Sequence, residues 1–148
     1  MKLLFRFILC CLFLISLPSA HAAEWGGVTD ALKEGKAQAK PIILKFESDN
    51  CGACDKLNEF TLSDPGVKAL LVHFATAKID VYDTDSIATY QGSAYTYREL
   101  TQHFNIKARP TSLFLTPDGV VIDAVKGYIP KQTYIQILNT ILNDYTVE

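Results

Sequence analysis

The chain has 148 residues, of which 49% are hydrophobic, and a formal net charge of −2. That length allows one ordinary domain with a core of its own. The mild acidity and the lack of any basic run argue against nucleic acid as a partner.

The first 22 residues have the pattern of a secretory signal peptide. Lys2 and Arg6 precede an apolar run of 11 residues at 7–17, and residues 20–22 have the small-x-small form that signal peptidase cleaves. Spanning a bilayer takes about 20 apolar residues, so the pattern favours a cleaved signal over a membrane anchor. We therefore expect an exported, periplasmic protein, with a eukaryotic secretory origin left open. Its mature domain is residues 23–148, with a net charge of −4 once Lys2 and Arg6 are removed.

Hydrophobic periodicity and turn residues predict alternating helices and strands in the mature chain. The strand at 42–47 is almost wholly apolar, as expected when helices cover both faces of a sheet. The polar stretch at 82–94 has no clear period and is predicted to be an irregular insertion loop. In chain order, the predicted elements are helix 28–39, strand 42–47, helix 51–62, helix 65–71, strand 74–81, helix 95–104, strands 111–116 and 120–125 around a turn at 117–119, and a helix from residue 130.

This order of elements predicts an α/β fold with a central mixed β-sheet of four to five strands flanked by helices. The turn at 117–119 contains Pro, Asp and Gly, and therefore predicts an antiparallel hairpin at the end of an otherwise alternating pattern. Asp49 and Asn50 are predicted to cap the helix at 51–62.

Cys51 and Cys54 form a C-x-x-C pair at a predicted strand-to-helix junction, and they are the only cysteines outside the predicted signal. Free backbone N–H groups and the helix dipole favour an anion at the helix start, which lowers the pKa of the Cys51 thiol. Cys54 follows about one turn later, within reach of a mixed disulfide on Cys51. The pattern predicts a redox-active dithiol in which Cys51 is the nucleophile and Cys54 the resolving thiol, with no bound cofactor.

Two other interpretations of the cysteine pair remain open. An inert disulfide would suit an exported domain, although closing a two-residue loop adds little stability. A metal site needs three or four protein ligands, and the mature chain offers only His73 and His103 and no second C-x-x-C. We expect no metal.

At Pro110-Thr111 the chain resembles the thioredoxin superfamily. The matching residues are Phe46 before the dithiol, Cys51 and Cys54, the Pro110-Thr111 pair and Gly127. In that superfamily a cis proline faces the C-x-x-C and the backbone of the preceding residue pairs with substrate. The resemblance therefore implies a cis bond before Pro110, where an ordinary trans turn is the alternative. It also implies a substrate-binding role for Arg109, Pro110, Thr111, Gly52 and Ala53.

A narrower resemblance is to the SoxW-type periplasmic thioredoxins. It is carried by the run at 40–47, the C-x-x-C pair, Asp64-Pro65, the loop before Tyr95 and Gly127-Tyr128. Proteins of this type look like reductases that keep the thiols of their partners in the reduced form. The resemblance therefore implies reduction of disulfides in exported proteins. It also implies a membrane electron donor of the DsbD kind, and we expect a monomer. The alternatives are a disulfide oxidase or isomerase, or a redox-inert thioredoxin-fold module that binds a partner or copper.

The chain departs from the usual thioredoxin pattern at two places. Gly52-Ala53 replaces the usual Gly-Pro, which leaves the redox potential open. Lys45 stands where many thioredoxins have a buried acid that helps to deprotonate the resolving thiol, and Glu47 lies two residues on, on the same strand face. We hypothesise that Glu47, paired with Lys45, takes this role for Cys54. The alternative is that both side chains are solvated at the strand end.

Two further features have both a functional and a structural interpretation. Arg109 either steers an acidic partner, stabilises the thiolate, or is simply solvated on the rim. Trp25 and the tyrosines at 82, 90, 95 and 97 either line a peptide-binding surface or fill local packing.

Overall fold

The computed structural model describes residues 24–145. The predicted signal peptide and its cleavage site lie outside these residues. Within them, no helix is long and apolar enough to cross a membrane.

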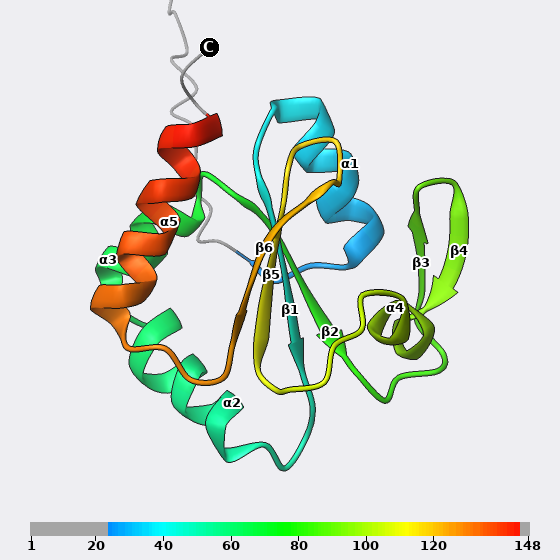
Figure 1. Ribbon diagram of the computed structural model, residues 1–148, viewed down its shortest axis with the longest axis horizontal. Coiled ribbons are helices and arrows are strands. Elements are labelled where there is room, and N and C mark those ends of the chain that lie inside the picture. The colour runs from blue at the N-terminus through cyan, green and yellow to red at the C-terminus, as the bar shows by residue number, and fades with distance from the viewer. Residues whose placement is uncertain (1–23, 146–148) are drawn as a thin grey trace, which may run out of the picture.

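A four-stranded mixed sheet forms the centre of the molecule, in the order β2-β1-β5-β6 (Figure 1). Strand β1 pairs in parallel with β2 and antiparallel with β5, which in turn pairs antiparallel with β6. The predicted fold class is therefore confirmed. The strands are β1 (Ile42–Glu47), β2 (Ala75–Asp80), β5 (Thr111–Leu115) and β6 (Val121–Lys126).

Helices cover both faces of this sheet, as the apolar β1 predicts (Figure 1). Ile42, Leu44 and Phe46 point into one core cluster and Ile43 into the other. Lys45 is the one charged residue of β1 that is nearly fully buried, at 3% exposure. One face carries α1 (Val28–Gln38) and α4 (Tyr97–His103), and the other carries α2 (Gly52–Leu57), α3 (Pro65–Leu71) and α5 (Lys131–Tyr145).

The predicted irregular loop at 82–94 is wrong, because most of it forms a β-hairpin. Strands β3 (Ile87–Tyr90) and β4 (Ser93–Thr96) pair antiparallel beside α4. Gln91 and Gly92 connect them with φ angles of 48° and 82°, the positive pair that a tight two-residue hairpin turn requires. The helix predicted from residue 95 begins two residues later, at Tyr97, because Thr96 is the N-cap of α4 in a capping box with Glu99.

The helix predicted over 51–62 is divided. Helix α2 continues into a π-helical segment, Asn58–Leu62, before the chain turns into α3. Asp49 and Asn50 do not cap α2, since the N-cap is Cys51. Asn50 instead has a left-handed φ of 53° and forms part of the turn after β1. Both differences bear directly on the dithiol.

Candidate active site

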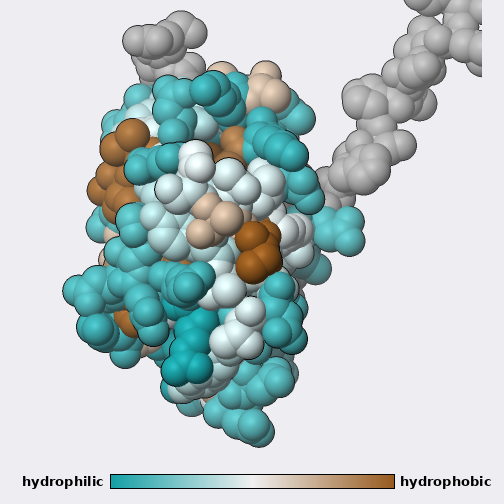
Figure 2. All heavy atoms as spheres, turned by 90° about the vertical axis from the view of Figure 1, so that its right-hand side faces the viewer, coloured by the Kyte–Doolittle hydropathy of each residue, from teal (hydrophilic) through white to brown (hydrophobic). Residues whose placement is uncertain are grey.

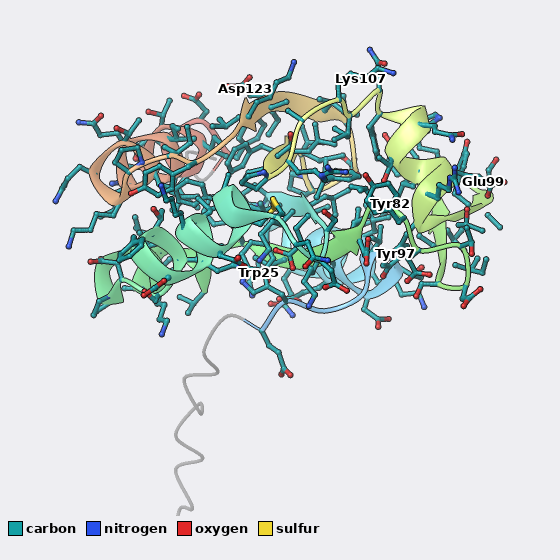
Figure 3. The ribbon with its side chains drawn as sticks, turned by 90° about the horizontal axis from the view of Figure 1, so that it is seen from below. Trp25, Tyr82, Tyr97, Glu99, Lys107 and Asp123 are labelled. Carbon is teal, nitrogen blue, oxygen red and sulfur yellow. A yellow bond between two sulfur atoms is a disulfide. The ribbon has the colours of Figure 1, made fainter. Side chains whose placement is uncertain are left out.

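The two cysteines lie at the start of α2 and form a disulfide with an S–S distance of 2.08 Å. The Sγ atom of Cys51 also accepts a hydrogen bond of 3.2 Å from the backbone N–H of Cys54, which makes Cys51 the N-cap residue. Cys51 is half-buried, whereas Cys54 is 3% exposed. A thiolate on Cys51 would receive this N–H, while Cys54 is shielded from bulk solvent. Figure 3 shows the disulfide near the centre of this end of the molecule.

The peptide bond between Arg109 and Pro110 is cis, as the resemblance implies. Pro110 is buried, and its carbonyl oxygen accepts a 2.7 Å hydrogen bond from the N–H of Gly127. The Thr111 hydroxyl donates to the Ala108 carbonyl at 2.8 Å. Thr111 pairs with Phe46 across the sheet, so the cis bond lies at the end of β1 from which the chain leads to Cys51.

Lys45 and Glu47 form an ion pair of 2.9 Å behind the dithiol. The Lys45 ammonium also donates a 2.7 Å hydrogen bond to the Asn58 side-chain oxygen, and the Asn58 amide nitrogen donates to Glu47 at 3.4 Å. Asn58 is the first residue of the π-helical segment, so this irregular turn presents it to the pair. The alternative that both charges are solvated does not hold for Lys45, although Glu47 keeps a side-chain exposure of 16%.

Trp25 lies against the other side of the Lys45 ammonium, which is 4.7 Å from the centre of its ring. Burial lowers the pKa of Lys45 from its ordinary value of 10.5, and the hydrogen bond and negative charge of Glu47 only partly offset this. The positive charge of Lys78, whose ammonium is 3.8 Å from the other Glu47 oxygen, also lowers the pKa of Lys45, but less than burial does.

A polar hollow of about 210 Å³ connects the second cysteine with this cluster. Cys54, Glu47 and Asn58 all line it, together with Lys78 and Asp80. The hollow is large and polar enough to hold several water molecules. The fold thus brings the predicted pair, Glu47 and Cys54, to one cavity.

Arg109, in contrast, is paired with a residue that the sequence did not connect to it. Its guanidinium carbon lies 5.0 Å from the Tyr82 ring centre, and a guanidinium N–H donates to the Tyr82 hydroxyl. Of the tyrosines considered, Tyr82 is exposed, whereas Tyr90 is core and Tyr95 and Tyr97 are partly buried. No sequence signal pointed to Asn58 or to the Tyr82–Arg109 contact, since both depend on tertiary placement.

A metal centre has no counterpart in the part of the chain that the structure describes. No group of three or more His, Cys, Asp or Glu side chains is placed to hold an ion there. Gly52 and Ala53 occupy the first turn of α2, and a methyl group added at Gly52 would meet no atom within 4 Å. The space beside Gly52 is therefore open.

The sequence profile of the thioredoxin-like domain matches residues 28–142. The chain belongs to the thioredoxin-like family. Among curated proteins, it is 29% identical over 116 residues to thiol:disulfide interchange protein DsbD 1 of Pseudomonas aeruginosa. That match covers 70% of this chain but only 18% of the relative, so the chain spans less than a fifth of the length of this protein.

Solved structures agree with the family assignment. A thioredoxin from Thermus thermophilus superposes with a TM-score of 0.66 at 26% identity, over 82% of this chain and 88% of that one. A disulphide isomerase from Xylella fastidiosa superposes with a TM-score of 0.61 at 28% identity, over 86% of this chain and 98% of that one. The narrower resemblance of this thioredoxin-like protein to the SoxW type stays a prediction.

Proposed function

We propose that this thioredoxin-like protein is a periplasmic thiol–disulfide oxidoreductase that reduces disulfides of exported proteins. The observation that carries the proposal is the pair at the start of α2, with Cys51 partly accessible and Cys54 buried, in a fold that also has the cis bond before Pro110. An inert staple would not need this division of exposure. The dithiol itself carries the two electrons, so no bound cofactor is required.

In the proposed reaction the reduced protein begins with a Cys51 thiolate. Its sulfur attacks one sulfur of the substrate disulfide, and the other substrate sulfur leaves as a thiolate that takes up a proton. Cys54 then loses its proton and attacks the Cys51 sulfur, which releases the second substrate thiol. The substrate gains two electrons and two protons, and the protein is left with the Cys51–Cys54 disulfide.

Glu47 is proposed to accept the proton that Cys54 loses. Both line the same polar hollow, and Lys45 and Asn58 hold the Glu47 carboxylate in place from behind. Water in this hollow supplies a path for the proton. Glu47→Gln should therefore slow release of substrate from the mixed disulfide without slowing its formation. Equal release rates in the variant and the parent would refute the role.

We propose that this protein acts in the periplasm as a monomer and receives its electrons from a membrane protein of the DsbD kind. The likeness to a segment of DsbD 1 supports this, because it relates the chain to a thiol:disulfide interchange protein. Arg109, Pro110 and Thr111 are proposed to contact the substrate together with Gly52 and Ala53, which lie between the two cysteines in the first turn of α2.

The reduction potential of Cys51–Cys54 is the measurement that tests the direction. The mature protein would be equilibrated with dithiothreitol or glutathione buffers and its thiols counted. Thioredoxin lies at about −270 mV and the oxidant DsbA at about −120 mV. A value near the first supports a reductase, and a value near the second refutes it.

A disulfide isomerase is the second candidate, because the Xylella fastidiosa isomerase is covered over 98% of its length. Refolding of a protein with scrambled disulfides separates the two. Without an external reductant, a small amount of an isomerase restores the native disulfides of many substrate molecules. A reductase stops once its own dithiol is oxidised.

A further inference from the structure

A groove rich in positive charge lies beside the loop that carries the cis peptide bond. It has a volume of about 240 Å³ and is bounded by the end of β2, by α4 and by the segment before Pro110. We call it the basic groove. The residues used below are its three cations Arg98, Lys107 and Arg109, the ring of Tyr82, and the apolar floor of Val81 and Ile106.

The three cations have no anionic partner within residues 24–145. The ion pairs found there involve Lys40, Lys45, Lys78 and Lys131 instead. None of the residues that line the basic groove is acidic. No carboxylate of the described residues forms an ion pair with these three cations, although the chain as a whole is acidic.

The acidic side chains near the basic groove accept hydrogen bonds from backbone N–H groups. Asp80 accepts the N–H of Tyr82 at 2.9 Å, and Asp83 accepts the N–H groups of Asp85 and Ser86 at 2.8 and 2.9 Å. The Glu99 carboxylate accepts the N–H of its cap residue at 2.8 Å. These hydrogen bonds to the backbone hold the carboxylates in turns and in the α4 cap.

Tyr82 fixes the orientation of Arg109 in advance. The stacked guanidinium uses one of its five N–H donors on the Tyr82 hydroxyl. The remaining donors keep the planar fork that matches a carboxylate. A side chain held in place before binding loses less freedom when a ligand arrives.

We propose that the basic groove binds an acidic segment of the partner protein, placed next to the cysteine whose disulfide is exchanged. This rests on the proposed function, because Arg109 immediately precedes the cis proline and thus joins the groove to the active site. In Figure 3, Tyr82 and Lys107 lie on the same side of the disulfide as α4. Figure 2 shows that this side of the molecule is mostly hydrophilic, with apolar residues in separate patches. The ligand is thus a carboxylate-bearing peptide.

The test uses two homodimeric peptide disulfides that differ in charge. Each peptide has one cysteine flanked on both sides by two glutamates, or by two glutamines in the matched neutral peptide. Reduced protein is mixed with each dimer at low and at 0.15 M salt, quenched with acid, and the released thiol is quantified by chromatography. The proteins are the parent, Arg98→Gln/Lys107→Gln, and the matched control Lys33→Gln/Lys36→Gln on α1, which removes the same charge outside the groove.

The parent should reduce the acidic dimer on the order of fivefold faster than the neutral one at low salt, and the ratio should fall with salt. Arg98→Gln/Lys107→Gln should lower this ratio clearly, with Arg109 retaining part of it, while Lys33→Gln/Lys36→Gln should leave it unchanged. Equal rates for both dimers in the parent, or equal ratios in both variants, would overturn the groove and leave the proposed function intact. If neither dimer is reduced, the proposed function fails and the inference fails with it.

A second measurement tests the groove without thiol exchange. Cysteine-free acidic and neutral peptides are titrated into the oxidised parent, and backbone amide shifts are followed by NMR. Shifts at 98–109 with the acidic peptide alone, weakened in Arg98→Gln/Lys107→Gln, support the proposal. Shifts that are absent, or are the same with both peptides, contradict it.

Discussion

Replacing Glu47 by Gln should destabilise the oxidised protein more than any other single change in the cluster behind the dithiol. Lys45 is buried with a side-chain exposure of 4%, and Glu47 is the anion that balances it at 2.9 Å. Removing one partner of a fully buried pair costs about 3–5 kcal/mol. Because Glu47 is 16% exposed and glutamine keeps a hydrogen-bond acceptor, we expect about 2–3 kcal/mol.

Lys45→Met should cost less, about 1 kcal/mol, because the Glu47 carboxylate that remains keeps other polar partners. Glu47 is the more exposed partner, and it retains Lys78 at 3.8 Å and the Asn58 amide at 3.4 Å. Adding Glu47→Gln to Lys45→Met should then cost little. The double-mutant cycle should give a coupling energy of about 2 kcal/mol between the two residues.

Urea unfolding of the four oxidised proteins, followed by circular dichroism, measures these differences. For a domain of this size, Glu47→Gln should also lower the melting temperature by about 10 °C. The reasoning is refuted if Glu47→Gln costs the same free energy in the parent and in Lys45→Met, since the two charges would then act independently.

The same cluster predicts a pH dependence. Burial holds the pKa of Lys45 below its ordinary 10.5 in the folded protein, so between that lowered value and 10.5 the unfolded chain binds more protons than the folded one. Lys45 therefore contributes a rise of stability with pH across this interval. The difference in stability between the parent and Lys45→Met should change in this direction, and a flat difference would contradict it.

Three further predictions concern other parts of the molecule. Cys54→Ser should accumulate a mixed disulfide with substrate that is visible on a non-reducing gel, and lack of any trapped species would contradict the resolving role. Tyr134→Phe should cost about 1 kcal/mol, because the buried hydroxyl lies 3.1 Å from Ser112 Oγ. Burial raises the pKa of Tyr134 to about 12, so the parent should lose stability relative to this variant between pH 10 and 12, as the unfolded tyrosine ionises first. Gly35→Ala should cost about 1–2 kcal/mol in urea unfolding, because the new methyl group would lie 2.5 Å from Ile42 Cγ1, and an unchanged midpoint would refute this.

The sheet and its helices could be predicted from local patterns because burial in this fold is nearly periodic. The apolar run of β1 required cover on both faces, and the Pro-Asp-Gly turn at 117–119 required a hairpin. The hairpin at 87–96 was missed because its strands are only four residues long and the apolar Ile87 on the exposed face breaks the alternation that marks a strand. Ala88 and Tyr90 are buried there, whereas Ile87 and Thr89 are exposed.

The candidate site was predictable only where chemistry follows from sequence spacing. The cysteine spacing placed both thiols at a helix start, and the family resemblance supplied the cis bond before Pro110. Asn58 was missed because the π-helical segment that presents it packs against α3 and α5, and such tertiary contacts cannot be inferred from local propensity. Tyr82 was missed as a partner of Arg109 because 27 residues separate them in the chain.

The basic groove and Glu47 are proposed to act on different steps of the reaction, so their roles can be tested separately. Cations in the basic groove meet the partner before any bond forms, so Arg98→Gln/Lys107→Gln should slow formation of the mixed disulfide with acidic substrates. Glu47 faces the hollow that Cys54 lines, so Glu47→Gln should slow only its resolution. Single-turnover reactions resolved in time give both rates in one experiment, because the mixed disulfide accumulates when resolution is slow and not when formation is slow. A variant of the groove that accumulated the mixed disulfide, or a Glu47→Gln protein that did not, would show that recognition and proton transfer are not divided in this way.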